Sequence, residues 1–134
     1  MSKIKRLLAL DVGERRIGVA QADTQVRIAL PYDTIEVDGS EVQAIAELVL
    51  RNDIDTIVIG YPRNQSGEPT AQTAKVEDFA ARLKDLDVEL VFQDESLTSV
   101  LAEQHLAARK QPYSRADIDA FAASIILEDY LESR

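Results

Sequence analysis

The chain has 134 residues, a length that suits one domain of ordinary size with a sizeable apolar core. It contains no cysteine, which excludes thiolate metal sites, iron–sulfur clusters, disulfides and a cysteine nucleophile. The formal net charge of −9 by itself argues against a nucleic-acid partner, because phosphate contacts come mainly from lysine and arginine. Residues 1–27 nevertheless hold six basic side chains against three acidic ones. A solvated acidic surface explains the same asymmetry, so both interpretations stay open.

The first ten residues, MSKIKRLLAL, resemble the start of a signal peptide. Asp11 ends the apolar stretch early, however, and no cleavage site of small residues follows. No apolar run approaches the roughly 20 residues that span a bilayer. We therefore expect a cytoplasmic protein with no membrane partner.

Three strand-like stretches come first, joined by the short turns GER and ADTQ, which favour an antiparallel meander. The stretches are residues 4–11, 16–22 and 26–36. Residues 40–52, SEVQAIAELVLRN, then predict a helix, because Ser40 and Gln43 have the spacing of a capping box.

The second half of the chain alternates helices with strands, as its apolar periodicity and turn residues indicate. The predicted elements are a strand over 56–60, a helix over 70–86, a strand over 88–93 and helices over 98–109 and 115–132. Helices that join the third, fourth and fifth strands require right-handed crossovers and parallel neighbours. We therefore expect an α/β, ribonuclease H-like fold in a single domain, 1–134. Its five-stranded mixed sheet has three antiparallel strands, then two parallel ones, with helices on both faces.

Carboxylates stand at strand ends and early in the last helix. Asp11 ends the first strand. Asp94 and Glu95 end the fifth, and strand alternation points them to opposite faces, so only one can join Asp11. The i+3, i+4 and i+7 neighbours of Asp119 are the apolar residues Ala122, Ala123 and Ile126. A charge on such a face is costly without a partner, although an acid near a helix N-terminus also complements the helix dipole.

Three carboxylates that converge on one point need a cation between them. At about 4 Å and an effective dielectric constant of about 20, each pair would repel by about 4 kcal/mol. Oxygen ligands, in a chain without cysteine and with no well-placed histidine, select a hard ion such as Mg²⁺ or Mn²⁺. Two such ions about 4 Å apart can activate a water and stabilise the leaving oxygen in phosphoryl transfer. Gly13, close to Asp11, lets backbone or substrate come near.

Four blocks in order carry a family resemblance: LALDVGERRIGVAQAD, IVIGYPRNQSGEPTAQTAKVEDFA, DESLTSVLAE and DAFAASIILEDYL. They resemble the YqgF (RuvX) family of Holliday-junction-resolvase-like proteins, which is also associated with processing of pre-16S ribosomal RNA. The first block is similar to the family motif D-x-G-x-[KR]-R-I-G-V-A. The matching residues of the first two blocks are Asp11, Gly13, Arg15, Arg16, Gly18, Gly60, Pro62, Asn64, Gly67 and Phe79.

The resemblance implies a nuclease in which Asp11, Glu95 and Asp119 are the catalytic, metal-binding acids, with Glu95 preferred over Asp94. The sequence departs from the family at Ser96, where arginine is usual. It also departs in residues 107–116, AARKQPYSRA, which are shorter and less basic than in many members. These departures concern nucleic-acid binding rather than the metal chemistry.

Basic and polar residues in three segments are candidates for phosphate contact. The loop YPRNQSG is first of all a turn, but it follows a parallel strand, where ligands bind in open sheets. The lone histidine, His105, is favourably placed as a solvated cation near a helix C-terminus, and catalysis is the less favoured role. The expected nucleic-acid-binding residues are Arg15, Arg16, Arg63, Asn64, Arg109, Lys110 and Arg115.

Two functions remain open. One is a metal-dependent endonuclease, acting on branched DNA or in maturation of the 5′ end of pre-16S ribosomal RNA. The other is a non-catalytic module of the same fold that binds RNA, the ribosome or a protein. A nucleotide phosphotransferase of the actin and sugar-kinase type needs two such domains, and 134 residues supply one. The sequence has no feature that would recognise a 2′-hydroxyl, so it does not distinguish an RNA from a DNA substrate. It also does not distinguish a monomer from a homodimer.

Overall fold

The computed structural model describes residues 4–62, 68, 70–95 and 98–133. It confirms the predicted five-stranded mixed sheet, whose strand order is β3-β2-β1-β4-β5. The strands are β1 (Arg6–Val12), β2 (Arg16–Asp23), β3 (Leu30–Glu36), β4 (Thr56–Pro62) and β5 (Glu89–Glu95). The helices are α1 (Glu41–Asn52), α2 (Ala71–Arg82), α3 (Thr98–Ala108) and α4 (Arg115–Glu132).

The sheet combines a meander with two crossovers. β2 pairs antiparallel with both β1 and β3, whereas β4 pairs parallel with both β1 and β5. The helices α1 and α2 make the connections that parallel pairing requires. The carboxyl ends of β1, β4 and β5 therefore meet at one edge of the sheet.

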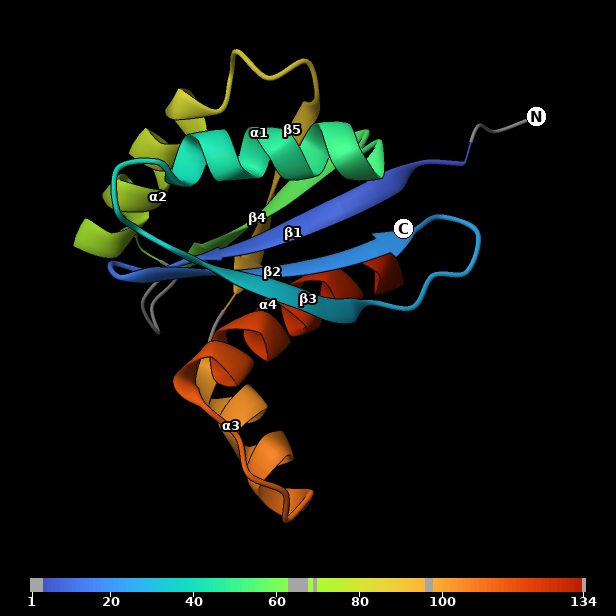
Figure 1. The fold of residues 1–134 in the computed structure, drawn as a ribbon, viewed down its shortest axis with the longest axis vertical. Coiled ribbons are helices and arrows are strands. Elements are labelled where there is room, and N and C mark those ends of the chain that lie inside the picture. The colour runs from blue at the N-terminus through green and yellow to red at the C-terminus, as the bar shows by residue number, and fades with distance from the viewer. Residues whose placement is uncertain (1–3, 63–67, 69, 96–97, 134) are drawn as a thin grey trace.

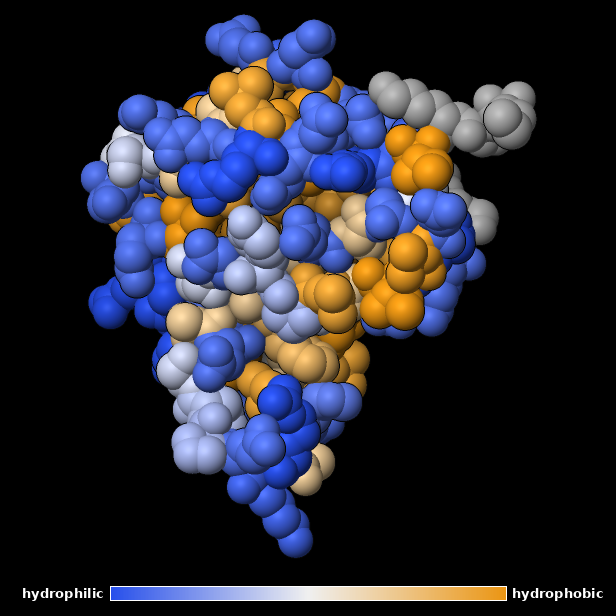
Figure 2. Space-filling model, turned by 45° about the vertical axis from the view of Figure 1, so that its right-hand side comes forward, coloured by the Kyte–Doolittle hydropathy of each residue, from blue (hydrophilic) through white to orange (hydrophobic). Residues whose placement is uncertain are grey.

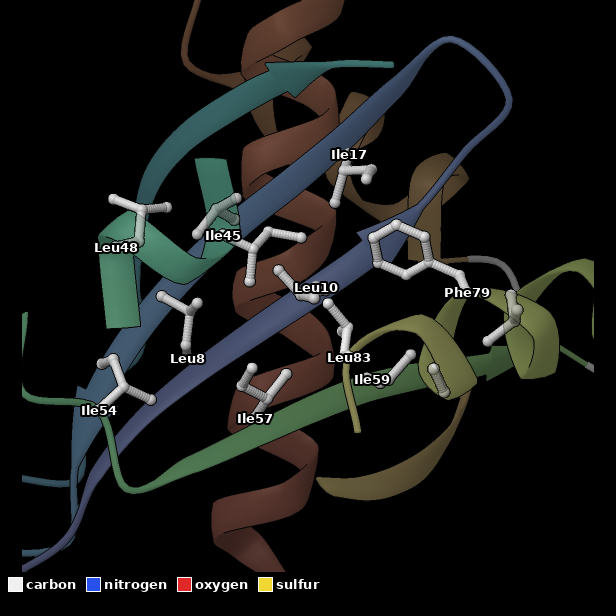
Figure 3. Close-up of a cluster of buried hydrophobic side chains, with 13 residues drawn as sticks. Leu8, Leu10, Ile17, Ile45, Leu48, Ile54, Ile57, Ile59, Phe79 and Leu83 are labelled. Carbon is white, nitrogen blue, oxygen red and sulfur yellow. The ribbon is translucent and has the colours of Figure 1, made fainter. Parts of the chain in front are cut away.

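The side chains of β1 alternate between two apolar layers. Leu8 and Leu10 are buried beneath α1 and α2, and Leu7 and Ala9 are buried against α4. Figure 1 shows α1 and α2 on one face of the sheet and α4 on the other, and Figure 3 shows the first layer. Burial of one such leucine contributes about 1.5 to 3 kcal/mol. The packing of these two layers determines to which face of the sheet each side chain of β1 points.

The last two helices form a hairpin in which α3 projects away from the sheet, while α4 runs along it (Figure 1). α4 begins at a capping box, as its sequence predicts. The Ser114 side chain accepts from the Asp117 backbone N–H, and the Asp117 side chain accepts from the backbone N–H of Ser114. This cap fixes the start of the helix that carries Asp119.

Three local expectations are wrong. The helix expected over 70–86 ends at Arg82, where the backbone N–H of Leu83 bonds to Ala80 in a turn. The third strand begins at Leu30 rather than at residue 26, because Asp23 accepts hydrogen bonds from the backbone of Gln25 and Val26, and Arg27 has a positive φ of 59°. That turn is incompatible with an extended chain. Ser40 does stand at the N-cap of α1, but its side chain makes no cap hydrogen bond and bonds to Asp38 instead.

The surface is mostly hydrophilic but carries apolar patches (Figure 2). Val26, Ile28 and Leu30 are exposed between β2 and the start of β3, and they line a hollow with Arg6 and Asn52. Within the described residues, none of the helices is long and apolar enough to cross a membrane.

Candidate metal centre

Asp11 lies on the α4 face of the sheet, near the carboxyl end of β1. It follows Leu7 and Ala9, which pack against α4, at two-residue steps, so strand alternation puts all three on one face. Its side chain is half-buried, and its partner in the antiparallel ladder is Gly18 of β2. The position opposite Asp11 thus carries no side chain.

Gly18 is the point at which α4 crosses the sheet. A Cβ built on Gly18 would lie 1.8 Å from the carbonyl oxygen of Asp119 and 3.0 Å from the backbone nitrogen of Ala120. Any other residue would therefore force the helix away from β2. The backbone of Asp119 consequently lies over the residue that pairs with Asp11, so the two predicted metal ligands are on the same face of the sheet.

Asp119 has a charged partner across this contact. The Nε of Arg16 donates to its Oδ2 at 2.6 Å, and the two side chains are 27% and 22% exposed. The hydrogen bond and the negative charge of Asp119 raise the pKa of the Arg16 guanidinium. Asp119 therefore does more than complement the helix dipole, because it pairs with Arg16. Arg16, which is also expected to contact phosphate, thus has a second partner in Asp119.

The turn that delivers Arg16 depends on a second close approach. The backbone N–H of Gly13 donates to the carbonyl of Arg16 at 3.0 Å, and a Cβ on Gly13 would lie 2.7 Å from that oxygen. The expectation that backbone comes close to Gly13 is confirmed. In the D-x-G-x-x-R-x-G pattern, Gly13 therefore permits the tight β1–β2 turn, and Gly18 permits the close crossing of α4.

The end of β5 supplies the remaining acids. Asp94 pairs in register with Tyr61 and Glu95 with Pro62. Leu90 packs into the layer beneath α1 and α2, so alternation places Asp94 on that face, where it borders a hollow with Glu77. Asp94 is therefore on the face opposite Asp11. For Glu95 the structure describes the backbone alone, at the same sheet edge as the end of β1.

The donor chemistry fits a hard divalent ion. Asp11 and Asp119 offer carboxylate oxygens on one face of the sheet, and Mg²⁺ and Mn²⁺ prefer such ligands. Among the described side chains, no three from histidine, cysteine, aspartate and glutamate form a metal cluster. The side chain of Glu95 is not among them, so the predicted set of three acids stays a prediction.

The expected phosphate-binding residues that the structure describes fall into two groups. Arg15 lies in the β1–β2 turn, next to Arg16. Arg109 and Lys110 follow α3, and Arg115 begins α4, so these three surround the connection in the α3–α4 hairpin (Figure 1). Arg115 precedes Asp119 by four residues, about 6 Å along the helix. Arg63, Asn64 and Ser96 lie outside the described residues.

His105 lies on α3, four residues before Arg109. Its exposed ring stacks on Phe121 with 4.6 Å between ring centroids, which ties α3 to α4. The structure thus gives it a packing role. The contact that sequence reasoning missed is the Arg16–Asp119 pair. Strand alternation puts Arg16 and Gly18 on one face of β2, but the sequence does not show that α4 crosses there.

Comparisons with known proteins agree with this architecture. The model of the RuvX family, described as Holliday junction resolvase, matches residues 5–133. A candidate pre-16S rRNA nuclease of Chloroflexus aurantiacus is 44% identical over 133 residues, which cover 96% of this chain and 87% of that protein.

Two solved structures share the fold at low sequence identity. T. thermophilus RuvC in complex with a Holliday junction substrate has a TM-score of 0.61 at 11% identity and covers 96% of each chain. The Fowlpox virus resolvase with Holliday junction DNA has a TM-score of 0.56 at 11% identity, over 96% of this chain and 97% of that one. The ribonuclease H-like fold is thereby confirmed, and the family match over nearly the whole sequence shows that this chain belongs to the RuvX family.

Proposed function

We propose that this chain is a metal-dependent endonuclease that hydrolyses phosphodiester bonds in structured nucleic acid. Residues 1–134 would act as one nuclease domain in the cytoplasm. Asp11, Glu95 and Asp119 would hold Mg²⁺ or Mn²⁺. The observation that carries the proposal is the crossing at Gly18, where the backbone of Asp119 lies over the register partner of Asp11.

Bound divalent ions would supply an activated water and stabilisation of the leaving oxygen. The contribution of the protein is to hold oxygen ligands in place before substrate arrives. Asp11 stands on a central strand, and the α4 helix that bears Asp119 is buried along β1 and β2. Ligands on such rigid elements keep their geometry, which matters because positioning supplies much of the rate in phosphoryl transfer.

The phosphate path would run from the hairpin connection toward Asp119. Arg109, Lys110 and Arg115 surround that connection, and Arg15 is exposed in the β1–β2 turn beside Arg16. We also assign Arg63 and Asn64 to this path, because they follow the parallel strand β4 in the sequence and Asn64 matches the family motif. A positive strip of this kind offsets the net charge of −9 where the nucleic acid must lie.

Precursor 16S ribosomal RNA is the first substrate to test. The relative from Chloroflexus aurantiacus, a candidate pre-16S rRNA nuclease, is 44% identical, whereas the resolvases bound to Holliday junctions are 11% identical. Branched DNA is the second substrate, because the family model carries the description Holliday junction resolvase.

The alternative function is a non-catalytic module that binds RNA, the ribosome or a protein. The net charge of −9 favours it, because an acidic surface suits a basic protein partner. The retention of all three acids in the sequence favours the nuclease.

A direct assay separates the two functions. Purified protein is incubated with Mn²⁺ and precursor 16S RNA, a four-way DNA junction or single-stranded RNA, with EDTA in parallel. We expect discrete cleavage of at least one structured substrate that EDTA abolishes. Binding without cleavage of any substrate would support the non-catalytic module, and equal cleavage in EDTA would contradict the metal chemistry.

A further inference from the structure

The Arg16–Asp119 contact uses only part of what each side chain offers. Arg16 donates through Nε to Oδ2 of Asp119 at 2.6 Å. Guanidinium has five N–H donors and carboxylate has two oxygens. Over the part of the chain that the structure describes, no hydrogen bond from the Nη groups of Arg16 is recorded, and none reaches Oδ1 of Asp119. The pair therefore leaves a second carboxylate oxygen and the outer edge of the guanidinium for other partners.

The contact is anchored by backbone on both sides. The carbonyl of Arg16 accepts from Gly13 at 3.0 Å, and Arg16 pairs with Glu36 across the β2–β3 ladder. Gly18, two residues along the same strand, holds the carbonyl of Asp119 in van der Waals contact. The backbones of both partners are therefore held in place, and the hydrogen bond from Arg16 favours the rotamer of Asp119 that makes it.

We propose that Arg16 is the positioning residue of the metal centre. Its Nε holds Oδ2 of Asp119 and so leaves Oδ1 for the ion, which pre-orients that ligand before metal arrives. Carboxylate ligands of metals are commonly oriented by such hydrogen-bonding partners. The inference rests on the proposed function, because it presumes that Asp119 binds a divalent ion. It adds to the phosphate role of Arg16, since the Nη groups stay available for the nucleic acid.

Two effects of Arg16 on metal affinity have opposite signs. Orientation of Asp119 strengthens binding of the ion, whereas the positive guanidinium repels it. Substitution of Arg16 by a neutral residue would remove both the orienting effect and the charge repulsion at once. Arg16→Lys keeps the charge but replaces the planar fork with a flexible point charge, so it isolates the orienting effect. Loss of an orienting partner typically lowers metal affinity about 10- to 100-fold.

The experiment is isothermal titration of the metal-free protein with Mn²⁺ at a temperature where every variant is folded by circular dichroism. Arg16→Lys should weaken Mn²⁺ binding by at least about tenfold. Arg15→Lys is the matched control, because Arg15 is exposed in the same turn and has the same charge. Val19→Ala is the stability control, since Val19 is fully buried on the same strand. Both controls should bind Mn²⁺ like the parent.

Asp119→Asn distinguishes failure of this inference from failure of the proposed function. If Asp119→Asn binds Mn²⁺ as tightly as the parent, the assigned metal centre is wrong and the role of Arg16 falls with it. If Asp119→Asn loses Mn²⁺ while Arg16→Lys binds like the parent, only the positioning role is overturned. An equal loss in Val19→Ala would also overturn it, because the effect would then follow from general destabilisation.

Discussion

At the scale of single residues, Gly18 decides whether the site can form. Gly18→Ala would put a Cβ 1.8 Å from the carbonyl oxygen of Asp119, so α4 must move off β2. Overpacking of this kind costs about 1 to 3 kcal/mol or more of unfolding free energy, and we expect the response to Mn²⁺ to be lost with it. Urea denaturation with and without Mn²⁺ measures both.

Gly39→Ala is the contrasting control for that substitution. Gly39 has a φ of 101° and no atom within 4 Å of a built Cβ, so alanine there strains the backbone but touches nothing near the site. We expect Gly39→Ala to lose stability yet keep its stabilisation by Mn²⁺. A Gly18→Ala variant that keeps that stabilisation would show that the crossing does not build the site.

Glu41 is a buried acid at the start of α1, on the sheet face opposite Asp11, and it is only 4% exposed. Its own backbone N–H, then that of Gly39, then Arg82 lower the pKa of its carboxyl. A lowered folded pKa gives stability that is present above the ordinary value of about 4.3 and is lost as pH falls through the folded pKa. Glu41→Gln should therefore cost about 1 to 3 kcal/mol near pH 7 and progressively less below about pH 4. A difference that does not change with pH in denaturant titrations would contradict this.

At the scale of elements, the start of α4 depends on a side-chain cap that α1 lacks. The hydroxyl of Ser114 accepts from the backbone of Asp117, whereas that of Ser40 bonds to Asp38 and not to its helix. Ser114→Ala should cost about 1 kcal/mol, the usual value of an N-cap, and Ser40→Ala less. Thermal denaturation of the two variants provides the comparison. An equal or larger loss in Ser40→Ala would mean that the cap at Ser114 contributes little.

The elements could be predicted because their signals are local. Apolar periodicity and turn residues predict the order of strands and helices, and the helical connections predict the mixed topology, which the structure confirms. The start of the third strand could not be predicted, because Asp23 bonds to its own turn and Arg27 takes a left-handed backbone. The predicted side-chain cap at Ser40 was also wrong, because its hydroxyl bonds to Asp38 instead of to the helix backbone.

The site could be predicted only in part. Strand alternation predicts only that Asp94 and Glu95 point to opposite faces, and the packing of Leu90 in the structure shows that Asp94 lies on the face opposite Asp11. The pairing of Arg16 with Asp119 joins residues 103 positions apart, and it depends on where α4 crosses β2, which no local pattern specifies. Gly18 can be picked out in the sequence, but the sequence does not show that Asp119 packs against it.

At the scale of the whole molecule, the proposed function requires an acidic protein to bind an anionic substrate through a few basic side chains. The net charge is −9, so affinity should fall steeply with salt, with a logarithmic slope of roughly 0.7 to 0.9 per phosphate contact. Arg115→Glu should weaken binding and reduce the slope. Arg51→Glu is the matched control, because Arg51 is exposed on α1, across the sheet from α4. Fluorescence anisotropy over a salt series tests this, and equal effects of the two reversals would rule out a path along the α3–α4 hairpin.

The central claim, that Asp119 is a ligand of catalytic metal, is tested most directly by thermal melts of Asp119→Asn with and without Mn²⁺, paired with the cleavage assay. Mn²⁺ should raise the melting temperature of the parent by several degrees, because it binds only the folded site. Asp117→Asn, the same change two residues away in the capping box, should keep that shift and the cleavage. Asp119→Asn should lose the shift and most of the cleavage rate, since it lacks the ligand charge. An Asp119→Asn variant that Mn²⁺ stabilises as it does the parent, and that cleaves at the parental rate, would contradict the account.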